Sequence, residues 1–187
     1  MKYLITGLGN IGDEYANTRH NIGFVVADAL AQDAKVSFDS DRLASVAKFR
    51  LKGHQVTIIK PTTYMNLSGK AVRYWMQQEN IPVENILIVT DDVDLPPGSL
   101  RMRPKGSGGS HNGMNSVIEV LGSNEFPRLR FGIGSNYPRG MQIDYVLGRW
   151  TKEEEKLFID RVPMAVEMIK TFVLSGVANA MNSYNNK

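Results

Sequence analysis

Two polar segments carry the residue types that general acid–base chemistry requires. His20 stands in the polar stretch Thr18–Asn21, and Asp92 follows shortly after the apolar run Ile86–Val89. A carboxylate beyond the carboxyl end of a buried strand can orient an imidazole and stabilise its protonated form, which leaves the second ring nitrogen to act as a base. From spacing alone, a turn or an acidic metal-binding loop explains Asp91–Asp94 equally well, and a lone histidine is more often a capping or surface residue.

Composition removes several other kinds of site. The chain has 187 residues with no Cys and only three His, which excludes disulfides, thiolate nucleophiles and Cys-ligated zinc or iron–sulfur centres. Ser68 lacks the G-x-S-x-G pattern of a nucleophile elbow. We expect no cofactor and, with so few histidines, no His-rich metal site.

Two glycine-rich stretches resemble phosphate-binding loops. Residues 7–12 match G-x-G-x-x-G, but nine mostly polar residues separate them from the next helical pattern. In a dinucleotide-binding fold the helix begins at the glycines, and an acidic residue ends a second strand about 20 residues later. Asp28 and Asp33 fall instead within or at the end of the expected helix, and a tight turn explains the glycines but not Asn10. The stretch Gly106–Gly113 resembles an anion-binding loop at a helix start, without the Lys-Ser/Thr ending of a P-loop.

Two short segments carry positive charge without any acidic residue. The net charge is +3 and the pI about 9.1, which alone indicates little about partners. All charged residues in 101–105 and 128–130 are basic, whereas residues 151–160 are acidic on balance. A local positive patch of this kind can bind a phosphate backbone without the whole protein being strongly cationic.

Strand-like and helix-like patterns alternate along the chain. This alternation predicts one α/β domain over residues 1–187, a twisted mixed β-sheet with α-helices packed on both faces, and a frayed end at 183–187. The expected strands are 2–8, 43–51, 55–60, 86–89, 99–103 and 129–134. The expected helices are 21–33, one capped by Ser68, one starting at Asn112 or Asn115, and a long one after a Thr151/Glu154 capping box, with a kink or break at Pro163.

Targeting signals are also lacking in the sequence. No run approaches the roughly 18 apolar residues of a transmembrane helix. The first residues lack the apolar core and cleavage site of a signal peptide. We therefore expect a cytoplasmic protein with no membrane contact and, in the absence of coiled-coil heptads, a monomer.

Taken together, five segments resemble the bacterial peptidyl-tRNA hydrolases. The resemblance covers about Lys2 to Asn179, and the five segments occur in order at suitable spacing. Two positions depart from the family pattern: Ile11 stands where the family usually has Pro, and Ser107–Ser110 varies a loop often richer in Gly. The matching stretches are GLGNIGDEYANTRHNIGF (7–24), KPTTYMNLSGKAV (60–72), DDVDLPPG (91–98), GGSHNGMNSV (108–117) and FPRLRFGIG (126–134).

The resemblance implies metal-independent hydrolysis of the ester that joins a peptide to the 3′ end of tRNA, which recycles tRNA from abandoned translation products. By this resemblance His20 is the base that activates water, Asp92 holds and polarises it, and Asn10 senses the peptide and helps to reject free aminoacyl-tRNA. The resemblance further implies that Asn66 and Asn112 bind substrate near the scissile ester, that Tyr15 and Tyr64 line the crevice, and that Arg103 and Arg130 clamp a tRNA phosphate.

Two other functions stay open at this point. A non-catalytic RNA-binding protein of the same fold would use the basic segments, but it would not need both His20 and Asp92. A nucleotide-binding oxidoreductase requires measurable NAD(P) binding, which we do not expect. The hydrolase reading depends on one spatial expectation, that the imidazole of His20 and the carboxylate of Asp92 lie together at the floor of one groove.

Overall fold

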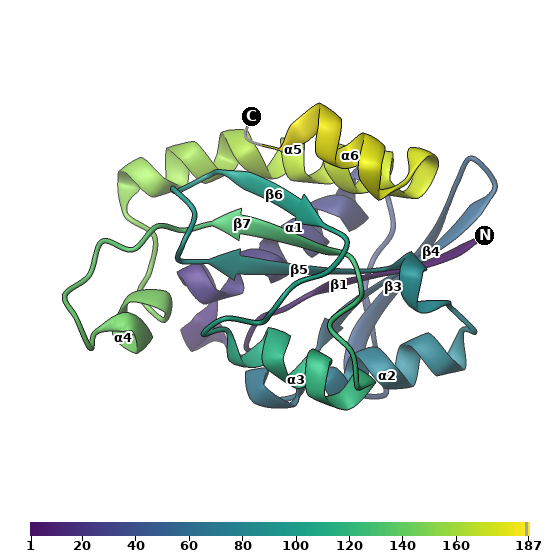
Figure 1. The fold of residues 1–187 in the computed structure, drawn as a ribbon, viewed down its shortest axis with the longest axis horizontal. Coiled ribbons are helices and arrows are strands. Elements are labelled where there is room, and N and C mark those ends of the chain that lie inside the picture. The colour runs from purple at the N-terminus through teal and green to yellow at the C-terminus, as the bar shows by residue number, and fades with distance from the viewer. Residues whose placement is uncertain (186) are drawn as a thin grey trace.

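The computed structural model describes residues 1–185 and 187, and its central feature is a mixed sheet (Figure 1). The strands are β1 Lys2–Gly7, β2 Asp39–Asp41, β3 Ala44–Leu51, β4 His54–Pro61, β5 Ile86–Asp92, β6 Leu100–Arg103 and β7 Arg128–Gly132. Within the described residues they form one seven-stranded sheet in the order β2-β3-β4-β1-β5-β7-β6. β4, β1, β5 and β7 are mutually parallel, whereas β3 pairs antiparallel with β4 and β6 with β7. The sequence-based prediction of a mixed sheet, with a hairpin over 43–60, is confirmed.

Helices cover both faces of the sheet, as predicted. The longer helices are α1 Ile22–Asp33, α2 Ser68–Gln78, α3 Asn112–Leu121, α5 Lys152–Ser175 and α6 Val177–Tyr184. α5 and α6 lie along one side of the sheet and α2 and α3 along the other (Figure 1). α1 joins α5 in one buried apolar cluster, and α2 and α3 form a second cluster on the opposite face.

Glycines allow β1 and its loop to approach α1 closely. A Cβ at Gly7 would lie 2.2 Å from the carbonyl oxygen of Gly23, and one at Gly9 would lie 2.7 Å from the ring of Phe24. Both distances are far below any real contact, so a side chain at either position would push the loop away from the helix. The glycines at 7 and 9 therefore serve strand–helix packing. Since α1 begins only at Ile22, they do not sit at a helix start as a dinucleotide site requires.

Three local predictions need correction. Ser68 does not cap α2: Leu67 is the N-cap residue, and the Ser68 hydroxyl donates to the Met65 carbonyl at 2.7 Å. Pro163 does not break the long helix, because α5 runs through it without interruption. The expected fraying over 183–187 is wrong for Ser183 and Tyr184, which belong to α6, while residue 186 lies outside the described residues. The Thr151/Glu154 capping box, in contrast, is present.

The edge strand β6 is closed by a side chain from the end of the chain. The backbone N–H of Met102 donates to Oδ1 of Asn185 at 2.7 Å, and Nδ2 of Asn185 donates to the Met102 carbonyl at 3.1 Å. The amide of Asn185 thus occupies both backbone groups of Met102, a buried residue on the edge strand of the sheet. None of the helices in the described part of the chain has the length and apolarity needed to span a bilayer.

Candidate active site

The carboxyl ends of the parallel strands gather the polar side chains at one edge of the sheet. β5 ends in Thr90, Asp91 and Asp92, and its pairing with β7 continues to Asp92 opposite Gly132. Beside it lies the one-turn 3₁₀ helix η2 (Arg19–Asn21), which carries His20, and the residue before α3 is His111. Sites in open α/β sheets are found at this edge, beyond the carboxyl ends of the strands.

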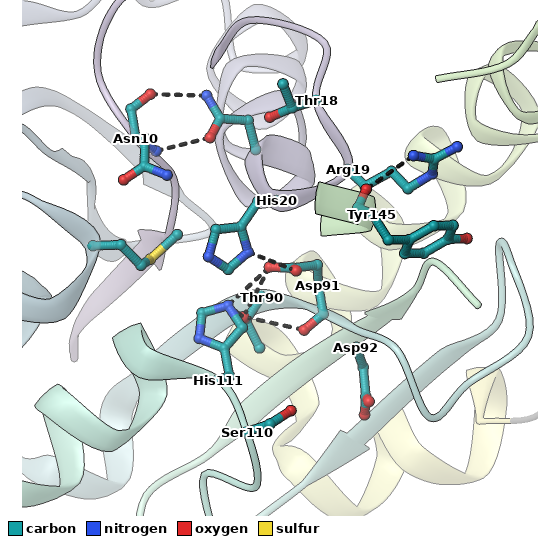
Figure 2. A network of polar contacts seen from close by, with 12 residues as sticks. Asn10, Thr18, Arg19, His20, Thr90, Asp91, Asp92, Ser110, His111 and Tyr145 are labelled. Atoms are coloured by element: carbon teal, nitrogen blue, oxygen red, sulfur yellow. Dashed lines mark hydrogen bonds and ion pairs between the residues drawn. The ribbon is translucent and has the colours of Figure 1, made fainter. Parts of the chain in front are cut away.

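The partner of His20 is Asp91 and not Asp92. Nδ1 of His20 lies 2.8 Å from Oδ2 of Asp91. Figure 2 shows the carboxylate of Asp92 directed away from this pair, and its Oδ2 lies 3.5 Å from Nη1 of Arg130. Adjacent side chains of a strand point to opposite faces. The prediction that Asp92 holds His20 is therefore wrong by one residue. An aspartate at the carboxyl end of β5 does contact the imidazole, but it is Asp91.

A second histidine, which sequence reasoning left in a candidate anion-binding loop, completes the cluster. Nε2 of His111 lies 2.8 Å from Oδ1 of Asp91 and 2.7 Å from the Thr90 hydroxyl. Its Nδ1 accepts a hydrogen bond from the Met114 N–H at 3.1 Å, so His111 is the N-cap of α3. An Nδ1 that accepts from a backbone N–H is not the donor nitrogen, so His111 donates to Asp91 from Nε2. The signal for this residue in the sequence was its position just before a helix start.

These contacts fix the tautomer of His20. One Asp91 oxygen receives the Nε2–H of His111, and the other faces Nδ1 of His20, so His20 is protonated on Nδ1 and Nε2 is left as the basic nitrogen. The two rings are tilted at 47° with centroids 4.8 Å apart. The carboxylate of Asp91 is thereby held between two ring donors (Figure 2).

Burial and charge act in opposite directions on the ionisable groups. Burial lowers the pKa of His20, but the charge of Asp91 and the hydrogen bond to it outweigh this effect and raise that pKa above 6.5. Burial raises the pKa of Asp91, yet its interactions with His111 and His20, including a hydrogen bond to each, bring that pKa well below its usual range. Asp91 therefore stays ionised although it is 3% exposed, and His20 is a stronger base than a free imidazole.

The same three side chains are the donor set that a transition metal accepts. One ligand atom each from His20, Asp91 and His111 lies within 4.8 Å of the others, and imidazole with carboxylate suits such ions. In the hydrogen-bonded arrangement, however, the inward ring nitrogens point at carboxylate oxygens at 2.8 Å. A metal bound there would replace both N–H···carboxylate hydrogen bonds. His20 would then lose the contact that keeps its proton on Nδ1.

A pocket of about 100 Å³ opens over this cluster. One wall is the 108–112 loop, and the opposite wall is the short helix α4 (Gln142–Val146), which contributes Ile143 and Val146. The amide Nε2 of Gln142 donates to the Ser110 hydroxyl at 2.7 Å, which joins the two walls. Of the predicted site residues, His20, Asp92, Asn112 and Arg130 line this pocket.

The other predicted side chains do not line this pocket. The Asn10 backbone N–H donates to Oδ1 of Asn21 at 2.7 Å, and Nδ2 of Asn21 donates back to the Asn10 carbonyl at 2.9 Å (Figure 2). Both lie on a neighbouring cavity of about 290 Å³. Asn66 is exposed on the 3₁₀ helix η3 (Met65–Leu67), Tyr64 just before it is 78% exposed, and Tyr15 is half-buried.

The two basic segments meet beside the pocket. Arg101 and Arg103 on β6 pair in register with Arg130 and Arg128 on β7. Arg128 is fully buried and donates to the carbonyls of Phe126, Ser107 and Asn124. Burial and the nearby charge of Arg130 lower the pKa of Arg128 to about 10. Arg103 is exposed, so it is available to a phosphate group outside the protein.

Comparisons with known proteins point to a single family. The chain is 57% identical to a peptidyl-tRNA hydrolase of Phocaeicola vulgatus over the full length of both chains. It is 54% identical to one of Porphyromonas gingivalis, over 99% of this chain and 100% of the relative. The crystal structure of peptidyl-tRNA hydrolase from Acinetobacter baumannii superposes with a TM-score of 0.93 at 35% identity, covering 98% of this chain and 94% of that one. The family model described as peptidyl-tRNA hydrolase matches residues 4–187. The chain belongs to the peptidyl-tRNA hydrolase family.

Membership of the peptidyl-tRNA hydrolase family confirms the sequence-based resemblance. It also disfavours the hypothesis of a nucleotide-binding oxidoreductase. That hypothesis requires a helix that begins at the glycines of residues 7–12, whereas α1 begins at Ile22. A nucleosidase from Streptococcus pyogenes shares the general fold, with a TM-score of 0.53 at 9% identity. This weaker likeness concerns the arrangement of strands and helices alone.

Proposed function

We propose that this protein hydrolyses the ester between a peptide and the 3′ end of tRNA, with His20 as general base and Asp91 as the group that orients it. The observation that carries the proposal is the 2.8 Å contact between Nδ1 of His20 and Asp91 at the pocket. It stands in a chain that matches the peptidyl-tRNA hydrolase model from residue 4 to 187. A binding protein has no need of an imidazole held in one tautomer by a buried carboxylate.

The geometry supports a direct attack by water. Nε2 of His20 takes a proton from water while the water oxygen forms a bond to the ester carbonyl carbon. The tetrahedral intermediate then collapses as the bond to the 3′ oxygen of tRNA breaks, and the imidazolium of His20 returns the proton to that oxygen. Asp91 stabilises the transient imidazolium without becoming protonated. A positioned base typically contributes about 10²–10⁴-fold to such a reaction.

The asparagines supply neutral donors and acceptors for the peptide and the developing oxyanion. Asn112 lines the pocket at the first turn of α3, where the helix N-terminus also favours negative charge. Asn66 lies on η3, whose Met65 sulfur sits beside Gly113 at the start of α3. We assign oxyanion stabilisation to Asn112, ester and peptide binding to Asn66 and Asn10, and the crevice walls to Tyr15 and Tyr64.

Arg103 and Arg130 provide the contact for a tRNA phosphate. Arg130 already donates to the Ser107 carbonyl at 2.8 Å, so its guanidinium is held at the pocket margin. Phosphate contacts carry no sequence information, which suits an enzyme that accepts many tRNAs. We further propose that the protein works as a monomer in the cytoplasm.

The decisive experiment is hydrolysis of a labelled peptidyl-tRNA with EDTA present. Release of free tRNA and peptide at an undiminished rate is expected, because no step uses a metal. Binding of the substrate without turnover would instead establish the non-catalytic RNA-binding function. Activity that EDTA abolishes and zinc or manganese restores would assign the His20–Asp91–His111 donors to a metal.

A further inference from the structure

We propose that Arg19 is a positioning residue, which fixes the turn that carries His20 and ties it to α4, the outer wall of the pocket. The proposal rests on the function proposed above, since His20 is the base there. Arg19 is the residue immediately before His20 in η2.

The guanidinium of Arg19 is buried and engaged on three sides. Its Nε and Nη2 donate to the two carboxylate oxygens of Glu154 at 2.9 and 2.8 Å. Nη1 donates to the carbonyl of Tyr145 at 2.9 Å, and the guanidinium carbon lies 4.1 Å from the centre of the Tyr145 ring. The exposed fractions of the Arg19 and Glu154 side chains are 11% and 12%. A planar fork that satisfies a carboxylate, a carbonyl and a ring at once permits one orientation only.

The backbone around Arg19 is attached to the same region. Its N–H donates to the Gly148 carbonyl at 3.0 Å, and the indole N–H of Trp150 donates to the Thr18 carbonyl at 3.1 Å. A Cβ at Gly148 would lie 2.6 Å from Nη1 of Arg19, so a side chain at this position would press on the guanidinium. Residues 18–19 and 148–150 therefore behave as one packed unit.

This unit joins the base to the pocket wall. The side chain of Arg19 extends toward Tyr145 on α4, whereas the next side chain, His20, faces Asp91 (Figure 2). Ile143 and Val146, on either side of Tyr145, line the pocket. The Tyr145 hydroxyl in turn donates to the Ile133 carbonyl just beyond β7. A rotation of the three-residue turn would therefore displace the imidazole and α4 together.

A buried ion pair of this kind is weak evidence for stability, because desolvation offsets most of the attraction. What it supplies is geometry, and a displacement of the base by about 1 Å can cost on the order of 10²-fold in rate. The expected signature is a loss of kcat that exceeds what any loss of stability explains.

The test compares Arg19→Gln, Arg19→Lys and Glu154→Gln, each assayed well below its own melting temperature. Arg19→Gln is expected to lower kcat about 10- to 100-fold with KM changed only a few-fold, and Arg19→Lys to restore part of the loss. The acid limb of the kcat/KM profile should move to lower pH, because a longer His20–Asp91 contact removes the interaction that raises the pKa of His20. The groups facing His20 are Asp91 and His111, and both are unchanged in these variants.

Two further variants serve as a second perturbation of Arg19 and as a control. Gly148→Ala leaves Arg19 intact but intrudes on its Nη1, so it should reproduce the kcat loss. Lys170→Gln breaks an ion pair from α5 to Asp33 of α1 and should leave kcat unchanged. NMR titration of the three histidines (His20, His54 and His111) reports the pKa of His20 without any assay.

Unchanged kcat and His20 titration in Arg19→Gln and Gly148→Ala, with a lowered melting temperature, would reduce Arg19 to a structural link and overturn the proposal. Should wild-type protein fail to hydrolyse peptidyl-tRNA, the proposed function fails, whereas the titration still decides whether Arg19 positions His20. If Arg19→Gln does not fold, kcat and the His20 titration are compared with the wild type in Glu154→Gln and Gly148→Ala instead.

Discussion

The buried cluster at the end of β5 and the rim around it are built in opposite ways. In the cluster, Asp91 is 3% exposed and both of its oxygens lie 2.8 Å from ring nitrogens of His20 and His111. On the rim, Asn66, Asn112 and Arg103 are exposed. The groups that we propose for the chemistry are thus arranged before substrate arrives, whereas the groups that we propose for substrate binding are exposed and would find their partners on binding. The difference separates effects on kcat from effects on KM.

Removal of the base should give the largest effect. His20→Ala is expected to lower kcat by about 10²–10⁴-fold, because no other described side chain presents a basic nitrogen to the pocket in this way. Single-turnover hydrolysis measures the rate, and circular dichroism checks that the fold is intact. Near-full activity in a folded His20→Ala protein would remove the mechanism.

The adjacent aspartates give the sharpest contrast. Asp91→Asn should lower kcat by about 10²-fold, at the lower end of the range expected for loss of the base, because the imidazole remains and only its orientation and charge stabilisation are lost. Asp91 raises the pKa of His20, and the base works only when deprotonated. Activity of the wild type should therefore fall as pH drops through a value above 6.5, and Asp91→Asn should move this limb to lower pH.

Asp92→Asn is the matched control for that variant. In the wild type, Oδ2 of Asp92 lies 3.5 Å from Nη1 of Arg130 and does not contact His20. The substitution should therefore change kcat by no more than a few-fold and leave the pH profile where it is. A larger effect from Asp92→Asn than from Asp91→Asn would contradict the geometry of the cluster.

Loss of a rim amide should give an intermediate effect. Asn112→Ala removes a neutral donor from the pocket, and loss of one oxyanion donor can cost about 10²-fold where it is fully engaged. We expect roughly 10-fold here, because the exposed Asn112 must first be ordered by substrate. Steady-state kinetics with one peptidyl-tRNA tests this role of Asn112. A change in KM alone would show that Asn112 binds the ground state of the substrate and does not stabilise the oxyanion.

The smallest effect is expected at the positive patch. Arg103→Ala should raise KM a few-fold at low salt and leave kcat unchanged. The slope of log affinity against log salt should become shallower by about 0.7–0.9, which corresponds to one phosphate contact. Affinity that matches the wild type at every salt concentration would reject the clamp at this position.

Most of the fold was readable from sequence because apolar periodicity and local signals agreed. The helix at 22, the capping box at Thr151 and the hairpin around Gly53 all depend on contacts between near neighbours in the chain. The break expected at Pro163 does not occur, since a proline in the sequence gives no account of the packing that holds α5 together around it.

The predicted partner of His20 was wrong by one residue, and the error has a physical reason. Two consecutive aspartates end β5, and sequence gives no register for the last pair of a strand. His111 was seen but given no role, because its two contacts with Asp91 and Thr90 come from an element 20 residues away. The Arg19–Glu154 pair joins residues 135 positions apart, which no local pattern reveals.

The amide of Asn185 that closes β6 has a practical consequence for handling the protein. Chain shortening from residue 185, or a tag that pulls this residue away, would bare the N–H and C=O of Met102 on the outermost strand. Such a bare edge invites pairing with another molecule. A purification handle at the amino end is therefore the safer choice, and light scattering of a protein shortened by three residues would show whether self-association follows.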